Sequence, residues 1–398
     1  MQISQPQSTI SQLGNARYQF DQCGSSLAAY SHLRVFTRFE DARTDWLALS
    51  REAAISPYQS FEFLSMWSDA IEASEDVTPF LIAAQDAKGA PSALLPLCII
   101  GKGPLRIAAF LGGREANFNL PLLSPDAQHD QESLWRLLHD AAKHAPSPPD
   151  LYFLRNQPRR FENAENPLVF ANARPSASCA YGTTLPATVD ELAARLSKEN
   201  RKKLRKKEAR LAEFGRVEYE HRVSGERRQA IAAALLEQKS ARFSAVGSKE
   251  RRFLTRLLRH ASGSEEGALE LHGLSVGGRI VAAYAGVRRS GRFSAMLNSF
   301  DTDEDIARCS PGELLLHALM RDLVLRGMTH FDLGAGEARY KRAVCEEEIA
   351  LYDQIVPVSA RGRLAAPLLA AFLRLKRRAK RAPALIHPYY RLRSLLRP

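Results

Sequence analysis

One stretch of the chain, residues 280–344, constrains the fold more than any other. It contains two runs of small apolar, β-branched and aromatic residues, 280–287 and 293–300, which a short glycine-containing turn separates. Such a pair of runs is typical of a β-hairpin. Leucines at helical spacing follow, then a short strand pattern at 330–333 and a second helix pattern. The order strand, strand, helix, strand, helix predicts an α/β unit with a helix N-terminus that opens out of the sheet.

The first of these two helices begins in a way that suits an anion. Ser310 offers a capping hydroxyl, and Pro311 takes the first helical position, where a missing N–H is of no consequence. The free N–H groups and the positive dipole end of a helix favour a negative group. Gly312 lets a phosphate approach the backbone, and Arg308 adds a positive charge nearby. An ordinary capped helix would show the same residues, so the short motif alone does not decide.

The wider sequence resembles a known family. The string NSFD…SPGELLL…RGMTHFDLGAGEARYKRAV, between Asn298 and Val344, is similar to the signature of the CelD-like (BcsL-like) acetyltransferases. These form a bacterial branch of the GNAT superfamily of N-acetyltransferases and are associated with cellulose synthesis. A basic helix that ends in glycine, residues 196–215, also resembles the family. The resemblance is specific in the C-terminal half of the chain and diffuse in the N-terminal half.

The resemblance implies direct transfer of an acyl group from acetyl-CoA or another acyl-CoA, with no covalent enzyme intermediate and no metal. The pyrophosphate of the donor would lie at the helix start. The thioester oxygen would face a backbone amide of the strand that ends at residue 300. The residues expected to bind the donor are Asn298, Ser299, Phe300, Arg308, Ser310, Pro311 and Gly312.

The acyl acceptor needs a base, and the leaving thiolate needs a proton or a positive charge. Asp332 and Glu337 are the carboxylates on either side of the Gly-Ala-Gly segment, and Tyr340 is a candidate proton donor. Lys341 is a candidate contact for an anion. Two structural alternatives stay open, because Asp332 could cap the following helix and Tyr340 could pack with its hydroxyl satisfied. These four residues are the catalytic candidates, and the base among them is not assigned.

The length of 398 residues suggests two domains. The order helix, helix, several strands, helix, strand occurs in residues 31–175 and again in 176–360. We therefore expect two tandem GNAT-like units, as in two-domain relatives of the superfamily, each a mixed, mostly antiparallel sheet flanked by helices. Residues 1–30 are rich in Gln and Ser and read as a flexible leader, and residues 351–358 are expected to close the second sheet.

Two further regions offer candidates for acceptor binding. The polar loop 112–119 carries Asn117 and Asn119, whose amides can donate and accept, although a loop held by side-chain to backbone hydrogen bonds fits equally well. Arg201 lies in the basic helix 198–214. That helix is a solvated charged face, a surface that steers an anionic ligand, or a nucleic-acid contact. No aromatic residue interleaves with its basic residues, which disfavours nucleic acid.

The net charge of +12 is concentrated at the end of the chain. Eleven positive charges and no acidic residue lie between Arg361 and the C-terminus, so the rest of the chain is nearly neutral. We expect residues 361–398 to form a basic amphipathic tail, with Leu368, Phe372 and neighbouring apolar residues on one side. Such a helix suits peripheral contact with an anionic membrane, or packing against the body or a partner.

Other sequence signals narrow the class of protein. The five cysteines are scattered and form no CxxC pair, so neither a zinc site nor a disulfide framework is indicated. No apolar run reaches the length that spans a bilayer, and the first residues do not resemble a secretory signal. We therefore expect a cytoplasmic location, with the tail allowing contact at the inner face of the membrane.

Taken with the resemblance, these patterns predict an acyltransferase that moves an acyl group from acyl-CoA to an amine or hydroxyl. The acceptor would be a sugar, a polysaccharide or a cell-envelope precursor, in keeping with cellulose or exopolysaccharide biosynthesis. One alternative is a Fem-like aminoacyltransferase that uses charged tRNA, which would dock on the basic helix. Another is a non-catalytic scaffold at the membrane surface. A nucleic-acid-binding protein is the least favoured, since no recognition motif accompanies the positive charge.

Overall fold

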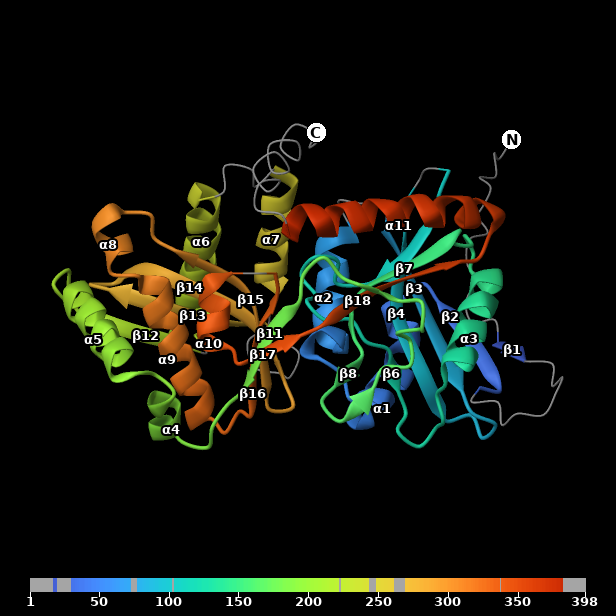
Figure 1. The fold of residues 1–398 in the computed structure, drawn as a ribbon, viewed down its shortest axis with the longest axis horizontal. Helices are drawn as coiled ribbons and strands as arrows, with labels where there is room; N and C mark the ends of the chain where they lie inside the picture. Colours follow the sequence, from blue (N-terminus) through green and yellow to red (C-terminus); the bar gives the residue numbers. More distant parts are fainter. Residues whose placement is uncertain are drawn as a thin grey trace, which may run out of the picture.

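The computed structural model describes residues 17–19, 30–72, 77–101, 104–221, 223–242, 248–260, 269–336 and 338–381. These residues form two mixed, mostly antiparallel sheets flanked by helices, which lie side by side along the long axis of the molecule (Figure 1). The predicted α/β architecture with two tandem units is confirmed.

The first sheet has the strand order β1-β2-β3-β4-β5-β7-β18-β10, with the short β6 also paired to β4. Alternate residues of its central strand β3 enter two different cores, as the strand period of two requires. Leu81 and Ala83 face α1 and α2, whereas Phe80 and Ile82 face α3. The strands of this sheet are β1 (Arg17–Gln19), β2 (His32–Phe36), β3 (Val77–Gln85), β4 (Pro91–Ile100), β5 (Ile107–Phe110), β6 (Leu122–Leu123), β7 (Leu151–Pro158), β10 (Arg174–Pro175) and β18 (Leu351–Pro357).

The helices of the first unit are α1 (Phe39–Glu52), η1 (Pro57–Gln59), α2 (Phe61–Glu72) and α3 (Gln131–His144). A small separate hairpin, β8 (Arg160–Phe161) and β9 (Ala164–Glu165), follows β7. α3 begins with a complete capping box, in which Asp130 and Ser133 exchange hydrogen bonds.

The second sheet has the order β12-β13-β14-β15-β16-β11-β17. Helices α6 and α7 cover one face, and α9 covers the other. Its strands are β11 (Ala180–Thr184), β12 (Val217–His221), β13 (Leu269–Val276), β14 (Arg279–Arg289), β15 (Arg292–Phe300), β16 (His330–Ala335) and β17 (Glu347–Ile349). Its helices are α4 (Val189–Ala194), α5 (Lys198–Ala212), α6 (Gly225–Arg242), α7 (Ser248–His260), α8 (Glu304–Arg308), α9 (Pro311–Leu325) and α10 (Arg339–Val344).

The two sheets repeat the same pairing pattern. All neighbouring strands are antiparallel except one pair in each sheet, β5 with β7 and β15 with β16. In both sheets the strand after this parallel pair, β18 or β11, runs antiparallel to it. The structure is therefore an internal repeat of one α/β unit.

The strand formed by residues 351–357 departs from expectation. We expected it to close the second sheet, but β18 pairs with β7 of the first sheet (Figure 1). The reason is a long antiparallel contact between residues 174–182 and 347–353. β10 pairs with β18 in the first sheet, β11 pairs with β17 in the second, and the amide of Ser176 donates to the carbonyl of Leu351 (2.8 Å) between them. These two segments form one ribbon, here called the crossing ribbon, that passes through both sheets.

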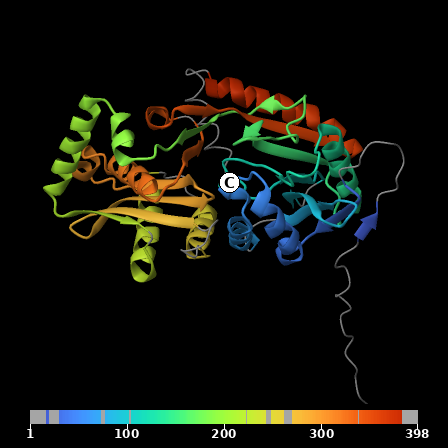
Figure 2. The same ribbon diagram turned by 90° about the horizontal axis from the view of Figure 1, so that it is seen from below.

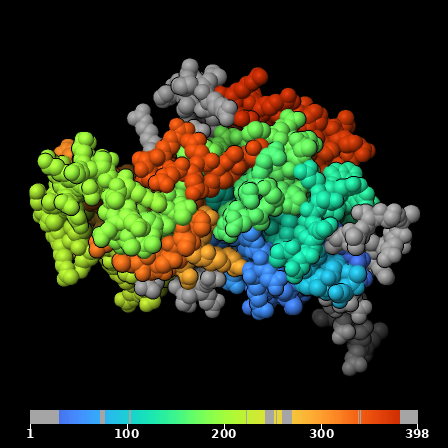
Figure 3. Space-filling model, turned by 60° about the horizontal axis from the view of Figure 1, so that its bottom comes forward, coloured from blue at the N-terminus to red at the C-terminus, as the bar shows by residue number. Residues whose placement is uncertain are grey.

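The basic helix α11 (Ala360–Arg381) also belongs to the first unit. It packs on β18 and β7, and it lies along the outside of that unit in three different views (Figures 1, 2 and 3). Gly362 permits this contact, since a Cβ there would lie 1.8 Å from the carbonyl oxygen of Asp150. We therefore propose to count residues 351–381 with the first unit rather than dividing the chain at residue 360.

Candidate active site

The parallel strands β15 and β16 separate soon after they begin. They pair at only three positions, the last of which joins Ser294 to Asp332. Directly after that pair each strand carries one extra residue, Met296 in β15 and Leu333 in β16, which has no partner on the neighbouring antiparallel strand. Such bulges bend a strand. Beyond them β15 stays with β14 and β16 stays with β11, so the two strands splay apart toward their C-terminal ends.

The start of α9 lies beside the end of β15. Ser310 adopts a left-handed backbone conformation (φ 54°, ψ 55°), which is unfavourable for a residue with a side chain. Within the described residues no side chain caps this helix start. A Cβ on Gly312 would lie 3.3 Å from the ring of Phe300, so glycine lets the first turn approach β15 closely. Pro311 occupies the first helical position, as the sequence predicts.

The charged residues near this helix start are already engaged. Arg308 is exposed, and its guanidinium lies 3.2 Å from carboxylate oxygens of both Glu304 and Asp305 on the same helix. Such exposed pairs are weak and exchange readily with solvent or another anion. Lys207 of the basic helix α5 contacts Glu313 in the first turn of α9, at 2.5 Å. The basic helix therefore stands next to the start of α9, with Arg201 partly buried near its own N-terminal end.

The last residues of β15 point to alternating sides of the sheet. The side chain of Asn298 donates to the hydroxyl of Tyr284 (3.2 Å). The hydroxyl of Ser299 is buried and donates to Gln238 of α6 (2.8 Å). Burial raises the pKa of Tyr284, with a smaller contribution from nearby Tyr340. Tyr340 itself is 42% exposed in the first turn of α10, so Asn298 and Tyr340 share the open side and Ser299 belongs to the other.

Asp332 is fully buried where the strands part. Its Oδ2 accepts a hydrogen bond from Ser294 (2.5 Å) and lies 3.7 Å from the guanidinium of Arg292, while its Oδ1 has no hydrogen-bond partner among the described residues. Burial raises the pKa of Asp332 to about 6, against the opposing effect of Arg292. It does not cap α10, whose N-cap residue is Ala338, so the capping alternative is not the one found.

Lys341 contacts the backbone at the end of β16. Its side chain is almost fully buried, and its ammonium donates to the carbonyls of Gly334 (3.3 Å) and Ala335 (3.1 Å). Burial lowers its pKa. It therefore ties α10 to the end of β16. Glu337, the other predicted carboxylate, lies outside the described residues.

The first unit reaches into this site through Asn117. Its Oδ1 accepts from the amide of Ala335 (3.0 Å), and its Nδ2 donates to the hydroxyl of Tyr58 (2.7 Å). Gly334 has φ +66°, and a Cβ there would overlap the Asn117 amide at 2.1 Å. Tyr58 is fully buried, and both burial and the nearby Asp332 raise its pKa. Asn117 thus fixes the end of β16 from the other unit.

Asn119, two residues later, stays within the first unit. Its side chain donates to the carbonyl of Arg155 (2.9 Å), and its amide donates to the carbonyl of Asn156 (3.0 Å). This is the loop-holding role that was the alternative to acceptor binding. Of the two asparagines, only Asn117 comes to the splayed strands.

Sequence reasoning missed three residues around Asp332, namely Arg292, Ser294 and Tyr58. Arg292 and Ser294 lie in a run that correctly predicted a strand. Their place beside Asp332 depends on the register of the parallel pair, which no local pattern contains. Tyr58 follows a Ser-Pro pair in the first unit, more than 200 residues away along the chain.

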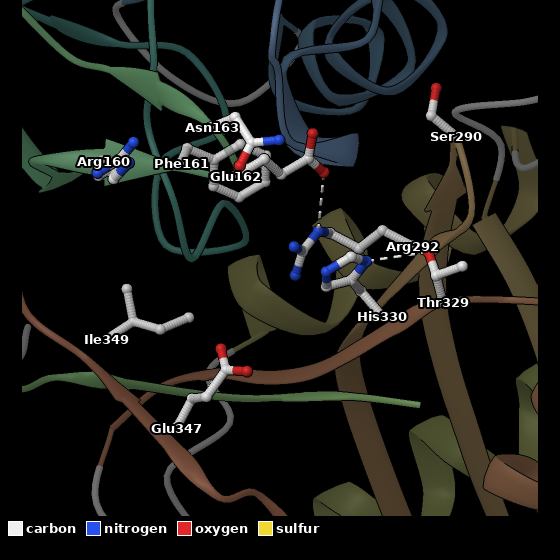
Figure 4. Close-up of a pocket in the computed structure, with 10 residues that line it drawn as sticks. All are labelled: Arg160, Phe161, Glu162, Asn163, Ser290, Arg292, Thr329, His330, Glu347 and Ile349. Carbon is white, nitrogen blue, oxygen red and sulfur yellow. Dashed lines mark hydrogen bonds and ion pairs between the residues drawn. The ribbon is translucent and has the colours of Figure 1, made fainter. Parts of the chain in front are cut away.

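A cavity of about 560 Å³ lies at the opposite, N-terminal ends of β15 and β16, against the β8–β9 hairpin of the first unit (Figure 4). Arg292 points from β15 toward this hairpin, with its Nε 3.6 Å from Glu162 and its guanidinium 4.8 Å from the centre of the Phe161 ring. The cavity is lined by Arg160, Phe161, Glu162, Asn163, Ser290, Arg292, Thr329, His330, Glu347 and Ile349.

Arg292 connects this cavity to Asp332, since the same guanidinium approaches both Glu162 and Asp332. Burial lowers the pKa of His330, and the neighbouring Arg292 lowers it further, so the imidazole is neutral near pH 7. The cavity therefore presents two arginines, two glutamates and a neutral histidine, a nearly balanced polar lining with one aromatic ring.

Comparison with known proteins gives one family match and several solved structures of similar fold. Residues 198–342 match the family model described as "Acetyltransferase (GNAT) domain". No curated protein matches the chain. The matched segment contains the splayed strands, the start of α9 and most of α10.

The similar structures span both units. A conserved protein of unknown function from Bacteroides thetaiotaomicron is 14% identical, with a TM-score of 0.51 over 81% of this chain and 99% of that one. FemX is 10% identical, with a TM-score of 0.53 over 80% of this chain and 94% of that one. A tandem GNAT protein from the clavulanic acid biosynthesis pathway is 11% identical, with a TM-score of 0.45 over 82% and 98%. At such identities the likeness concerns the fold.

These comparisons do not identify the CelD-like branch of the superfamily, and that narrower assignment stays a proposal. The coarser assignment is plain, because the domain match and the splayed strands fall on the same residues. Residues 198–342 match a GNAT acetyltransferase domain within a two-unit fold, and this match supports an acyltransferase.

Proposed function

We propose that this enzyme transfers an acyl group directly from acyl-CoA to an amine or hydroxyl at the gap between β15 and β16. The observation that carries the proposal is the separation of these strands immediately after the Ser294–Asp332 pair, with the start of α9 alongside. The gap leaves backbone groups of β15 without a neighbouring strand, and Asp332 stands at its closed end.

The donor fits the open end of the gap. The diphosphate of acyl-CoA would accept a hydrogen bond from the amide of Gly312 at the start of α9, where the dipole favours negative charge. Pro311 has no N–H, and the amide of Glu313 already donates to the carbonyl of Ser310 (3.0 Å). Gly312 leaves room for that approach, and Arg308 would exchange its exposed carboxylate partners for phosphate. The adjacent α5 carries a strong excess of lysine and arginine, which would steer an anionic donor toward the site.

The thioester would lie along the end of β15, with an amide from residues 297–300 donating to its oxygen in the transition state. In this proposal Asp332 accepts the proton of the attacking amine or hydroxyl, because its pKa of about 6 leaves it ionised at neutral pH. The new bond to the acyl carbon forms as the carbon–sulfur bond breaks. Tyr340, exposed on the open side, returns a proton to the leaving thiolate. Lys341 and Asn117 hold the end of β16 in place.

The acceptor would enter through the cavity between the units. Its paired arginines and carboxylates suit a polar molecule with several hydroxyls or an amino group, and Phe161 offers a ring for an apolar sugar face. This supports a sugar, polysaccharide or cell-envelope precursor as the acceptor. We accordingly propose a CelD-like role in bacterial cellulose or exopolysaccharide synthesis, on the cytoplasmic side and in contact with the membrane.

Titration calorimetry of the full chain with acetyl-CoA tests the donor. We expect measurable binding heat and a rise in the thermal unfolding midpoint, because a ligand that binds only the folded state stabilises it. Acetyl transfer to a panel of amino sugars and polysaccharides, followed by release of free CoA thiol, then tests the acceptor. If saturating acetyl-CoA gave neither heat nor a thermal shift, the donor assignment would be wrong.

A Fem-like aminoacyltransferase is the second candidate. Likeness of fold to FemX and the basic surface of α5 favour it. Its donor would be charged tRNA, and phosphate contacts would make binding strongly salt-dependent. A comparison of aminoacyl-tRNA and acetyl-CoA binding, for the wild type and a Lys202→Glu/Lys206→Glu variant, separates the two candidates. Tighter binding of tRNA that this variant abolishes would favour the Fem-like reaction.

A further inference from the structure

α11 presents a row of large apolar side chains to solvent. Leu364, Leu368, Phe372 and Leu375 are 76, 74, 60 and 66% exposed, and their spacing of four, four and three residues places them on one face of the helix. They are four of the nine large apolar residues that are exposed in the described part of the chain. We call this row the outer stripe of α11.

The outer stripe is exposed although the helix itself is packed against the first unit. The opposite face of α11 holds the helix against the first unit, where Gly362 lies on the carbonyl of Asp150 and Ala370 is buried. The hydroxyl of Ser359 donates to the Asp150 carboxylate at the helix start (2.6 Å), and Arg174 donates to the carbonyl of Ala370 (3.5 Å). The helix lies along the outside of the first unit (Figures 1 and 3), where one side is fixed and the apolar residues of the other side are exposed.

The charge of the helix selects the kind of partner. The sequence of α11 contains eight lysines and arginines and no acidic residue. Arg361, Arg363, Arg374 and Arg378 are exposed together with the outer stripe. A second copy of the chain would bring two such basic faces together, and like charges repel. An apolar row with basic neighbours instead suits a surface that has an apolar interior beneath a layer of negatively charged groups.

We propose that the outer stripe of α11 is a docking face for the anionic surface of a lipid bilayer. The helix would lie in the plane of the interface, with the four apolar side chains among the acyl chains and the arginines at the lipid headgroups. At about 1.5 Å per residue the stripe from Leu364 to Leu375 would make a contact roughly 17 Å long. Among the described residues no helix is long and apolar enough to cross the bilayer.

Vesicle flotation with the full chain tests this docking face. We expect binding to vesicles of phosphatidylcholine mixed with phosphatidylglycerol, and much weaker binding to phosphatidylcholine alone. Raising the salt from about 0.1 M to about 0.5 M should reduce the binding, because exposed charges are screened over a shorter distance. A variant with Leu364, Leu368, Phe372 and Leu375 all changed to Gln should lose at least about a hundredfold in partition coefficient, since no large apolar side chain of the stripe could then enter the acyl chains.

Matched single substitutions separate this face from general surface hydrophobicity. Leu368→Gln should weaken partition about five- to tenfold, whereas Leu325→Gln, at a position 70% exposed on α9, should leave it unchanged. Thermal unfolding of each variant should stay close to that of the wild type, because the substituted side chains are already exposed.

Three results would overturn the proposal: equal binding to neutral and anionic vesicles, unchanged binding by the fourfold variant, or a solution dimer that the fourfold variant abolishes. The last would show that a second copy covers the stripe. None of these measurements uses acyl-CoA, so their outcome is independent of the acyltransferase assignment.

Discussion

The two units share one strand pattern but treat the gap after their parallel pair differently. In the second unit β15 continues to Phe300, and the gap toward β16 stays free of other strands. In the first unit β5 stops at Phe110, and its strand position beside β4 resumes only at β6. The intervening residues 111–121 fold back, and Asn119 donates twice to carbonyls of β7. The first unit therefore fills with its own chain the place that the second leaves open.

The helices that follow show the same contrast. α3 in the first unit begins with a capping box that satisfies its amides from within. Its counterpart α9 begins at a strained Ser310 with no side-chain cap among the described residues. In α3 the Asp130 side chain occupies the amide of Ser133, whereas at the start of α9 no side chain among the described residues occupies the amide of Gly312. The comparison teaches that two copies of one strand pattern differ at a single place, which is open in the second unit and filled in the first.

The largest effect should come from the carboxylate at the closed end of the gap. Asp332→Asn keeps the shape and the hydrogen bond from Ser294 but removes the base, so kcat should fall by about 10³-fold. Acyl transfer monitored by thiol release measures this loss. Asn166→Asp is the control, because it makes the reverse exchange of an amide and a carboxylate at a buried site of the first unit. It should lower the free energy of unfolding and leave kcat unchanged. A fall of less than about threefold for Asp332→Asn would remove Asp332 from the base role.

The two helix starts should respond oppositely to substitution. Gly312→Val adds bulk toward Phe300 and the expected phosphate position, so acetyl-CoA should bind about thirtyfold more weakly, or roughly 2 kcal/mol. Asp130→Ala, at the capped start of α3, should lower the free energy of unfolding by about 1 kcal/mol and leave donor binding unchanged. Calorimetry and denaturant unfolding measure both quantities. Equal loss of donor binding in the two variants would erase the distinction between the units.

The pH dependence follows from the raised pKa of Asp332. The base works when ionised, so kcat/KM should fall about tenfold between pH 7 and pH 5, through a midpoint near 6. Stability should change in the opposite direction. Because the folded pKa lies above the ordinary value of 3.8, burial of Asp332 favours its protonated form, and this contribution is lost as the pH rises through about 6.

Asp332→Asn provides the control for the predicted pH dependence of kcat/KM and for that of stability. The free energy of unfolding of the variant minus that of the wild type should be larger at pH 7 than at pH 4. The increase should be up to about 3 kcal/mol. Thermal unfolding across this pH range measures the difference. A wild-type profile without a midpoint between pH 5 and 7 would contradict the assignment.

The smallest effect should distinguish the two asparagines of the filling segment. Asn117→Ala removes two side-chain hydrogen bonds, of which the one from the Ala335 amide joins the units, and Asn119→Ala removes one within the first unit. Each should cost about 1–2 kcal/mol of stability. Only Asn117→Ala should also lower kcat, by a few fold, because only Asn117 holds the end of β16. Matching kinetics for the two variants would show that the cross-unit contact does not position the site.

Much of the fold was predictable because it rests on local patterns. The apolar runs at 280–287 and 293–300 became β14 and β15, and the Ser-Pro pair marked the start of α9. The order of elements also predicted the repeat. Strand period, helix spacing and capping are encoded over a few neighbouring residues, and the second unit follows them closely.

The rest depends on contacts between distant segments. The sequence placed β18 in the wrong sheet, since its pairing with β7 follows from the crossing ribbon rather than from its own residues. Arg292 and Ser294 meet Asp332 only through the register of a parallel pair. Lys341 looked like an anion contact, yet its ammonium binds two carbonyls because α10 folds back over β16. The register between strands that are far apart in the sequence cannot be inferred from any short segment of the chain.

The crossing ribbon has a consequence for how the protein is made. The first sheet takes one of its inner strands, β18, from residues that follow all strands of the second sheet in the chain, so the second unit must be synthesised before the first sheet can be completed. Neither half can mature alone during synthesis, and a nascent first half exposes the edge of β7 until β18 arrives. Such an interlocked pair is poorly suited to domain shuffling, which favours units that fold independently.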